Sequence, residues 1–303
     1  MDRIRFSAVI PTYNRRNMIG HAIDSVLRQS YPAHEIIVVD DGSTDGTIEY
    51  LKELYSNFPN ISLIRQENLE RGAARNRGLN DASGDYVVFL DSDDKMLSQH
   101  LEILSRKILE LNGPDFIATK YRFESDAGLS NADIMEIPEG FHDYHLFLQG
   151  NPLACNICVK KSNPNLALFE EDRKYAIKED WMFLLQNTRY SKVYIIDAVS
   201  LVMHDHPERS MRSGNTLIIN KTKLAREWIR ERIPLSRPDL KKLDSHISYF
   251  CAIHSYIDGK RVQALRYVIN AIKSGGFRLK YFVLASKITL GKKLVDKLKG
   301  VRP

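Results

Sequence analysis

Three carboxylates follow a short apolar run and have the spacing of a metal site. Asp91, Asp93 and Asp94 come directly after the apolar run Tyr86–Leu90. Side chains two residues apart at the end of a strand point to one side, so Asp91 and Asp93 would face together. Carboxylate oxygens suit Mg²⁺ or Mn²⁺, and such an ion shared with a diphosphate neutralises charge that builds on a leaving group. The pattern therefore predicts a divalent cation site, although acids are also frequent in loops without one.

Three other side chains that follow apolar runs have chemistry that suits a nucleotide. Tyr13 could stack on a nucleobase, Asp41 could accept a hydrogen bond from a base or ribose, and Arg75 could pair with phosphate in a bidentate manner. The segment after Asp41 has a second interpretation, a turn in which Ser43 or Thr44 caps the next helix. Four chemically compatible clusters follow four successive apolar runs, and this co-occurrence favours the functional interpretation.

Short apolar runs alternate with segments of helical period through the first 120 residues. Runs of this length without polar alternation predict strands buried on both faces of a parallel sheet, joined by right-handed connections. We expect strands at Phe6–Ile10, Glu35–Val39, Ile61–Arg65, Tyr86–Leu90 and Phe116–Lys120. We expect helices at Met18–Ser30, Thr44–Tyr55, Gly72–Ala82 and Ser98–Leu111. Because ligands bind outside the carboxyl ends of such strands, the four clusters would face one crevice.

The rest of the chain is less regular at first and helical at the end. Residues 124–150 are irregular and end in an expected short helix at Tyr144–Leu148, and two further strands are expected at Cys155–Lys160 and Val193–Ile196. The last third has helical period with breaks at Pro234, Pro238, Gly259 and Gly275-Gly276. We therefore expect one α/β domain over residues 1–215 and a basic helical region over residues 216–303.

The composition is ordinary for a globular chain, but the charge is unevenly distributed. Hydrophobic residues make up 43% and charged residues 27%, and no stretch reaches the roughly 18 apolar residues of a membrane-spanning helix. No secretory signal is expected, and three cysteines fit a reducing, cytoplasmic setting. Residues 221–303 hold 20 lysines and arginines against 6 acids, whereas residues 1–220 hold 24 against 32. The basic end predicts a polyanionic partner, either a membrane or nucleic acid.

Four ordered segments resemble the hallmark motifs of family 2 glycosyltransferases. They are Val9-Ile-Pro-Thr-Tyr-Asn14, Ile37-Val-Val-Asp-Asp-Gly-Ser-Thr-Asp45, Gly72-Ala-Ala-Arg-Asn-x-Gly78 and Phe89-Leu-Asp-Ser-Asp-Asp94. The resemblance is close over about residues 5–110 and fainter to about residue 210. It implies the GT-A fold, a mostly parallel sheet flanked by helices, and transfer of a sugar with inversion of the anomeric centre. It also implies a nucleotide-sugar half at 1–110 and an acceptor half at 111–215.

The resemblance assigns the donor site residue by residue. It implies donor-binding roles for a set drawn from all four motifs: Pro11, Thr12, Tyr13, Asp40, Asp41, Arg75, Asp91, Ser92 and Asp93. In this set Thr12, Tyr13 and Asp41 would bind the nucleoside, and Arg75 would lie near the donor diphosphate. Mn²⁺ or Mg²⁺ would be held by the acids of the last motif, Asp93 and Asp94 with Asp91. UDP is the carrier that the family favours, with TDP and GDP left open.

An inverting displacement requires one carboxylate to take the proton of the attacking acceptor hydroxyl. The resemblance places this base in a Glu-Asp pair that opens a late helix. In this chain Glu179 and Asp180 are followed by Trp181, Leu184 and Leu185, which would pack the helix inward. Asp180 is therefore the implied catalytic base. Without the resemblance, both acids are explained as first-turn residues that the helix dipole favours.

Two further segments carry groups that could bind metals. His206-Pro-Glu-Arg-Ser210 resembles a family element, with glutamate where the family often has glycine, and this implies His206 in the donor site. A zinc site at His204 and His206 would need further ligands that the sequence does not offer. Cys155 and Cys158 have redox or zinc spacing, but no second cysteine pair exists, so we expect them to pack within a strand.

The last helical segment has an apolar stripe with lysines beside it. The stripe is Phe277, Tyr281, Leu284, Ile288, Val295 and Leu298, and the lysines are Lys280, Lys287, Lys293 and Lys297. Such a helix can lie on an anionic membrane, and it can equally pack into a core with a solvated basic face. Many members of the resembled family extend lipid-linked glycans at the cytoplasmic leaflet. The resemblance therefore favours the inner face of a membrane as a partner.

The resemblance to family 2 glycosyltransferases also implies a lipid-diphosphate-linked glycan as acceptor, in the synthesis of capsule, O-antigen or exopolysaccharide. Nucleic acid is not an expected partner, because the basic residues are not interleaved with aromatics on a known nucleic-acid module. A Rossmann dehydrogenase is disfavoured because no Gly-x-Gly-x-x-Gly follows the first strand. Nucleotidyl transfer is also disfavoured, because it would require a glycine-rich basic loop after the first strand, which this sequence lacks. A degenerate transferase acting as a sensor is disfavoured by the complete set of carboxylates.

Overall fold

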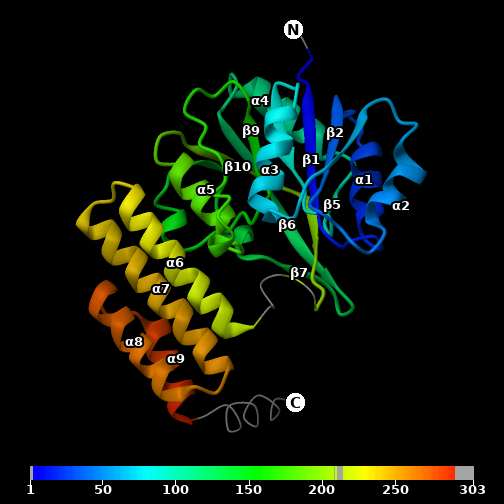
Figure 1. Cartoon of the computed structure of the whole chain (residues 1–303). Coiled ribbons are helices and arrows are strands. Elements are labelled where there is room, and N and C mark those ends of the chain that lie inside the picture. The colour runs from blue at the N-terminus through cyan, green and yellow to red at the C-terminus, as the bar shows by residue number, and fades with distance from the viewer. Residues whose placement is uncertain (1–2, 208, 210–213, 291–303) are drawn as a thin grey trace. The chain divides into compact units, whose positions relative to one another are not determined.

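The computed structural model describes residues 3–207, 209 and 214–290. It divides into two compact units, one made of Met1–Phe147 and Asn151–His206 and the other of Leu148–Gly150 and Pro207–Pro303. Figure 1 shows that the strands belong to the first unit and that the second is a bundle of helices. The expected domain boundary at residue 215 stays a prediction.

One sheet organises the first unit, and within the described residues it has ten strands. The strands are β1 (Phe6–Thr12), β2 (Glu35–Asp40), β3 (Ile61–Arg65), β4 (Tyr86–Phe89), β5 (Lys95–Met96), β6 (Phe116–Ser125), β7 (Gly128–Asn131), β8 (Gly140–His142), β9 (Cys158–Lys160) and β10 (Val193–His204). Its α-helices are α1 (Ile19–Leu27), α2 (Thr47–Tyr55), α3 (Glu70–Asp81), α4 (His100–Glu110) and α5 (Glu179–Asn187). Short 3₁₀ turns cover Asp133–Glu136 and Arg173–Tyr175.

The strand order is β3-β2-β1-β4-β9-β6-β10-β5. The first four strands are parallel, so their carboxyl ends lie at one edge, as expected from the alternation of runs and helices. The strand β9 is antiparallel to both β4 and β6, and β5 is antiparallel to β10. The sheet is therefore mixed and mostly parallel, with helices packed against it, which confirms the expected α/β architecture of the GT-A type.

Strand burial explains why the N-terminal strands have continuous apolar runs. All residues of β1 are buried, as are all but the first of β2, because helices cover both faces of this part of the sheet. A Cβ atom on Gly78 would lie 2.3 Å from a methyl carbon of Val9, so only glycine lets α3 approach β1 this closely. Figure 1 shows α3 lying across the strands at this point.

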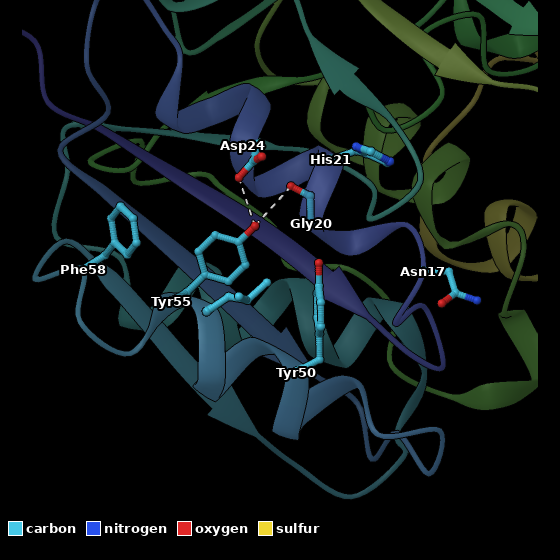
Figure 2. A pocket seen from close by; sticks show the side chains of 8 residues that line it. Asn17, Gly20, His21, Asp24, Tyr50, Tyr55 and Phe58 are labelled. Atoms are coloured by element: carbon cyan, nitrogen blue, oxygen red, sulfur yellow. Dashed lines mark hydrogen bonds between the residues drawn. The ribbon is translucent and has the colours of Figure 1, made fainter.

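The helices α1 and α2 lie side by side, and an open pocket of about 340 Å³ lies between them. Figure 2 shows Tyr55 reaching from α2 to Asp24 of α1, and its hydroxyl lies 3.0 Å from the Asp24 carboxylate. A Cβ atom on Gly20 would lie 2.7 Å from the Tyr50 hydroxyl, so the end of the Tyr50 side chain would have to shift to admit a larger residue there. The helices that line the pocket pack against the sheet, α1 against β1 and α2 against β3.

Several element boundaries differ from those expected. The strand β10 continues eight residues past the expected end at Ile196, because register shifts against β6 let it bend and go on pairing. The strand β9 begins at Cys158, and Cys155 lies in a turn before it, so the expectation that both cysteines lie in a strand was wrong. The expected helix at Tyr144–Leu148 is a 3₁₀ turn over Phe147–Gln149.

The second unit is helical, as expected, with α6 (Asn215–Arg232), α7 (Arg237–Ile257), α8 (Arg261–Gly275) and α9 (Leu279–Leu290). Pro238 does not break a helix but lies in the first turn of α7, where its missing N–H costs nothing. The side chain of Ser236 caps this turn by accepting a hydrogen bond from the Asp239 amide. In the described part of the chain, no helix is both long and apolar enough to cross a membrane.

The apolar stripe expected on the last helix does not face outward. Tyr281, Leu284 and Ile288 are buried in the core of the second unit, together with Ala264, Val268 and Ala271. The core-packing interpretation is therefore right for these three residues, since the stripe provides the contact of α9 with α7 and α8. Phe277 is exposed. Val295 and Leu298, with Lys293 and Lys297, lie outside the described residues.

Candidate active site

The ends of β1 and β2 bring the first two motifs together. Thr12 is paired with Asp40 across the parallel strands, and the Asp41 amide donates to the Thr12 carbonyl at 2.8 Å. Pro11, Thr12 and Asp40 lie within the strands rather than after them. Asp40 is fully buried, and its carboxylate accepts a hydrogen bond from the Ser43 amide at 3.2 Å.

The loops that follow these strands are tied to one another. The Asn14 amide donates to the Ser43 hydroxyl at 2.9 Å, and the Thr44 amide donates to the Asn14 side chain at 2.8 Å. Neither Ser43 nor Thr44 caps α2, which begins at Thr47 after a left-handed Gly46, so the capping interpretation was wrong. Tyr13 is 47% exposed between the tied residues, in a position open to a stacking partner.

Asp41 is held by the loop after β3. One oxygen of its carboxylate accepts hydrogen bonds from the Gln66 side chain at 2.8 Å and from the Leu69 amide at 2.9 Å. Asp41 is buried, and these bonds compensate for its removal from water. Its predicted hydrogen bond to a base or ribose stays a prediction.

The three acids of the fourth motif gather after β4. One carboxylate oxygen from each of Asp91, Asp93 and Asp94 can be chosen so that all lie within 4.8 Å of one another. A hydrogen bond of 3.0 Å from the Asp94 amide to the Asp91 carbonyl closes the turn that carries them. Among the described residues, this is the one group of three or more histidine, cysteine or acidic side chains close enough to share a metal ion. Ser92, between the acids, is buried.

The long strand β10 brings His206 to this cluster. The strand β5 directly follows the acids and pairs with β10 at Leu201 and Val202, so the end of β10 runs past the acid turn. The His204 amide donates to Asp94 at 3.0 Å, and His206 Nε2 lies 2.9 Å from an Asp93 oxygen. His206 is buried, and its Nδ1 has no hydrogen-bond partner among the residues that the structure describes. The structure therefore has His206 beside the acid cluster, and the donor-site role that the resemblance implies for it stays a prediction.

Arg75 lies between the acid cluster and the predicted base helix. Its Nη2 is 2.7 Å from an Asp91 oxygen, and its Nη1 is 2.9 Å from a Glu179 oxygen. The side chains of Arg75 and Glu179 are 2% and 3% exposed, so this is an ion pair removed from water. Both ends of the guanidinium are thus engaged with protein carboxylates. The predicted bidentate contact of Arg75 with phosphate stays a prediction.

Other residues of the third motif anchor the segment that precedes α5. The Asn76 side chain donates to the Phe169 carbonyl and accepts from the Phe169 amide, each at 2.9 Å. A Cβ atom on Gly72 would lie 2.4 Å from the Glu170 carbonyl oxygen, so glycine is needed for this contact. Together with the bond between Arg75 and Glu179, these contacts hold the start of α5 against α3.

Asp180 stands in the first turn of α5 and is partly buried. Its two oxygens accept hydrogen bonds from the Asn151 side chain at 3.0 Å and from the Trp181 amide at 2.7 Å. Burial, with repulsion from Glu179 as the next cause, raises the pKa of Asp180 to about 6. The residue Ile177 just before the helix has φ of +80°, a strained conformation for a β-branched side chain. Trp181, with Leu184 and Leu185, is buried as expected.

Some contacts of the site were not predictable from the sequence motifs. Asn151 follows a glycine and precedes a proline, which predicts a turn and not a partner for Asp180. Glu179 was treated as a neighbour of the base, and its bond to Arg75 joins residues 104 positions apart. Cys155 and Cys158 are free and buried, in agreement with the expectation that they pack in the interior, and burial raises the pKa of both thiols.

With this geometry established, similarity to known proteins decides the family. The family model described as glycosyl transferase family 2 matches residues 7–161, slightly more than half of the chain. The chain belongs to glycosyl transferase family 2. The matched segment of this family 2 chain contains all four motifs and the acid cluster, and it ends before Asp180 and His206.

Curated relatives match parts of this family 2 chain. It is 39% identical over 125 residues to glycosyltransferase GlyA of Streptococcus pneumoniae, covering 41% of this chain and 18% of GlyA. Over 97 residues it is 44% identical to the putative teichuronic acid biosynthesis glycosyltransferase TuaG of Bacillus subtilis, covering 32% and 38%. Over 108 residues it is 37% identical to the GalNAc(5)-diNAcBac-PP-undecaprenol beta-1,3-glucosyltransferase of Campylobacter jejuni, covering 35% of each. The matches span less than half the length of each relative.

Solved structures share the fold over most of the chain. The crystal structure of S. aureus TarS 1-349 in complex with UDP-GlcNAc has a TM-score of 0.67 and 20% identity, covering 93% of this chain and 84% of that one. Another crystal structure of TarS 1-349 has a TM-score of 0.66 and 21% identity, covering 89% and 81%. At this identity the likeness establishes the shared fold of this family 2 member.

Proposed function

We propose that this chain is an inverting glycosyltransferase that moves a sugar from a nucleotide diphosphate donor to an acceptor hydroxyl. The observation that carries the proposal is the link that Arg75 makes between the acid cluster at Asp91 and the acidic start of α5 at Glu179. This link supports the proposal because it joins the acids suited to a diphosphate-bound cation to Glu179, the residue next to a carboxylate suited to remove a proton. Family membership over the donor-binding motifs supports the same assignment.

The acid cluster fits a divalent cation. Asp91, Asp93 and Asp94 offer hard oxygen ligands within 4.8 Å of one another, which suits Mn²⁺ or Mg²⁺ better than a soft metal. When bound, the cation offsets the negative charge that develops on the diphosphate as it leaves. The buried His206 orients Asp93 through its bond of 2.9 Å, and the His204 amide holds Asp94.

Asp180 is the catalytic base in this proposal. Its carboxylate removes the proton from the acceptor hydroxyl while the hydroxyl oxygen attacks the anomeric carbon and the bond from that carbon to the phosphate oxygen breaks. The proton ends on Asp180, and the electron pair of the broken bond leaves with the nucleoside diphosphate. The bonds from Asn151 and the Trp181 amide fix the orientation of this carboxylate.

Arg75 acts as a positioning residue in this scheme. Its buried guanidinium holds the Asp91 carboxylate at the cation site and the Glu179 carboxylate beside the base. One side chain therefore sets the distance between the cation site and the start of α5, which carries the base. Its positive charge also opposes the rise in the pKa of Asp180 that burial and Glu179 cause. A role of the same group at the donor diphosphate would add to this structural role.

We further propose a UDP-sugar as donor, either a hexose or an N-acetylhexosamine, with Thr12, Tyr13 and Asp41 at the nucleoside. The UDP-GlcNAc complex of the TarS structure with the same fold supports this choice. A lipid-diphosphate-linked glycan is the proposed acceptor, in a surface polysaccharide pathway. The names of the Bacillus and Campylobacter relatives support it, since they refer to teichuronic acid and to an undecaprenol-linked glycan.

A panel of nucleotide sugars tests the donor and the metal. Thermal unfolding is followed with UDP-, TDP- and GDP-sugars, with and without Mn²⁺. A UDP-sugar at a hundred times its Kd should stabilise the folded chain by about 2.7 kcal/mol, and removing Mn²⁺ should reduce the shift in Tm. If no nucleotide sugar raises Tm in either condition, the donor assignment is wrong. Donor hydrolysis in the same samples separates an enzyme from a binding-only sensor.

We also propose that the protein works at the inner, cytoplasmic face of an anionic membrane. The balance of 20 basic against 6 acidic residues over 221–303 supports attraction to a negatively charged surface. Such a location brings the chain to an acceptor that is itself anchored in lipid.

A further inference from the structure

The helix α9 is apolar on the face opposite to the one it buries. Tyr281, Leu284 and Ile288 pack into the core of the second unit, yet Leu279 and Phe282 are 76% and 57% exposed. A helix of a globular protein normally has one apolar face, which it buries, so apolar residues on a second, opposite face are left uncovered by the core. The second face of α9 is therefore a surface suited to a partner that the core of the unit does not provide.

This second face is continuous along the helix. Leu279, Phe282, Val283 and Leu290 are all exposed, and their spacing of three, four and seven residues places them on one side of α9. Phe277, which precedes the helix and is 73% exposed, extends the surface, since its ring centroid lies 6.3 Å from that of Phe282. We call these five residues the outer face of α9.

The charged residues in the chain segment that contains the outer face are all basic. Residues 260–290, which include α8 and α9, contain no aspartate or glutamate. They contain seven basic residues: Lys260, Arg261, Arg266, Lys273, Arg278, Lys280 and Lys287. On α9 itself, Lys280 and Lys287 are exposed beside the apolar residues, with the Lys280 ammonium group 4.8 Å from the centre of the Tyr249 ring. The exposed surface of α9 thus combines apolar side chains with two lysines.

We propose that the outer face of α9 inserts into the headgroup region of an anionic lipid bilayer. The inference deepens the proposed membrane partner and names the residues that make the contact. Leu279, Phe282 and Val283 enter the acyl boundary, while Lys280 and Lys287 meet lipid phosphates, as in an interfacial helix. Of the stripe that the sequence pointed to, Tyr281, Leu284 and Ile288 form the inward face, whereas the proposed contact uses the other side of the helix together with the exposed Phe277.

Charge selects this partner over the alternatives. A second copy of this chain would bring two surfaces of the same sign together, which opposes association. Nucleic acid would satisfy the cations but leave exposed leucine, valine and phenylalanine side chains without an apolar environment. A bilayer with anionic headgroups satisfies both kinds of group at once.

Vesicle flotation tests the proposal with the full chain. Wild-type protein should float with phosphatidylcholine vesicles that contain phosphatidylglycerol and remain unbound with pure phosphatidylcholine. Raising NaCl should weaken the binding because salt screens the attraction between the cations and the anionic headgroups. The double variant Leu279→Ser with Phe282→Ser should bind at least about tenfold more weakly, because two apolar side chains no longer enter the bilayer. Lys280→Glu with Lys287→Glu should lose binding as well.

Matched controls separate the outer face from general effects. Leu129→Ser in β7 removes an equally exposed leucine of the first unit, and Lys52→Glu in α2 reverses an exposed lysine there. Both controls should bind vesicles like wild type. The thermal shift caused by UDP with Mn²⁺ should be unchanged in the α9 variants, so a failure of membrane binding is distinguishable from a failure of the proposed transferase function.

The proposal is overturned if wild type does not float with anionic vesicles, or if both α9 double variants bind as tightly as wild type. It is also overturned if the Leu279→Ser, Phe282→Ser change abolishes a dimer in sedimentation velocity while vesicle binding is absent, since the face would then join two copies. Binding of wild type to DNA or RNA in preference to anionic vesicles would assign the cations to nucleic acid instead.

Discussion

The two compact units use positive charge in opposite ways. In the first unit, Arg75 is enclosed between Asp91 and Glu179 and is removed from water. In the second, Lys280 and Lys287 are exposed on a helix that has no acid in its own sequence or in that of α8. A buried cation has to be paired because its desolvation is costly, whereas an exposed cation stays solvated until an anionic partner arrives. Burial therefore separates charges that build the site from charges that are offered to a partner.

The largest effect is expected where the first unit performs chemistry. Asp180→Asn should lower the transfer rate by about 10⁴-fold, the upper end for a lost general base, because the amide cannot take the acceptor proton. The amide can still accept from the Trp181 amide, so the fold and UDP binding should persist. Initial rates with a UDP-sugar and the Tm measure this. Asp81→Asn on the surface of α3 is the control, and full activity in Asp180→Asn would falsify the mechanism.

Two arginines of α3, one in a buried ion pair and one in an exposed ion pair, test the difference between buried and exposed charges most directly. Arg75→Met should lower the free energy of unfolding by about 3–5 kcal/mol, because Glu179 and Asp91 lose their cation and Glu179 remains buried. Arg77→Met, two residues on in the same helix, breaks an exposed pair with Asp81 and should cost less than about 1 kcal/mol. Urea denaturation compares the two. Equal losses would show that burial is not what distinguishes these arginines.

A positioning role of Arg75 has its own readout. Arg75→Lys keeps the positive charge, so the fold should largely be retained. A lysine cannot, however, bridge two carboxylates with a planar fork. We expect kcat to fall by about tenfold or more and the Mn²⁺ concentration at half-maximal rate to rise, because Asp91 is no longer held. A change in stability with kcat and Mn²⁺ dependence unaltered would make Arg75 purely structural.

The acid cluster should lose its cation when one ligand is neutralised. Asp93→Asn is expected to reduce the transfer rate by about a hundredfold, since the metal ion supplies several kcal/mol of charge stabilisation to the leaving group. The additional thermal shift that Mn²⁺ gives in the presence of UDP should disappear. Asp126→Asn, an exposed acid in the turn after β6, serves as the matched control. Retention of the Mn²⁺ effect in Asp93→Asn would place the metal elsewhere.

Lowering the pH should reduce the transfer rate, because it protonates the carboxylate of Asp180. The base acts in its ionised form, and burial raises the pKa of Asp180 to about 6. The ratio kcat/KM should therefore be constant above about pH 7 and fall about tenfold for each pH unit below 6. Vesicle-free assays with a water-soluble acceptor give this profile. A profile without any decline down to pH 5 would be inconsistent with a base of this pKa.

The smallest effect is expected on the basic helix. Lys287→Glu reverses an exposed charge on α9, and the free energy of unfolding should change by less than about 0.5 kcal/mol. The same substitution contributes to the loss of vesicle binding proposed above. A loss of stability comparable to that of Arg75→Met would mean that the cations of α9 also hold the fold together.

The sequence predicted the N-terminal half of the site well because its signals are local. Apolar runs between helical segments identified β1 to β4, and the acids after β4 form a cluster in the structure as expected. The strands are parallel, so their carboxyl ends meet at one edge of the sheet, and the motifs that follow them lie together there. The same logic did not reach β5, β7 and β8, which are two to four residues long and carry no run of their own.

The sequence by itself determined the fold class, the family and the types of side chain at the strand ends, since these follow from the periodicity of apolar residues and from ordered motifs. Tertiary structure alone decided that Arg75 faces Glu179 rather than open solvent, that β10 brings His206 to Asp93, and that α9 buries Tyr281 while exposing Phe282. The physical reason is that these outcomes depend on contacts between distant segments. Pairing and burial there are set by which surfaces meet, and neither spacing nor composition along the chain specifies that.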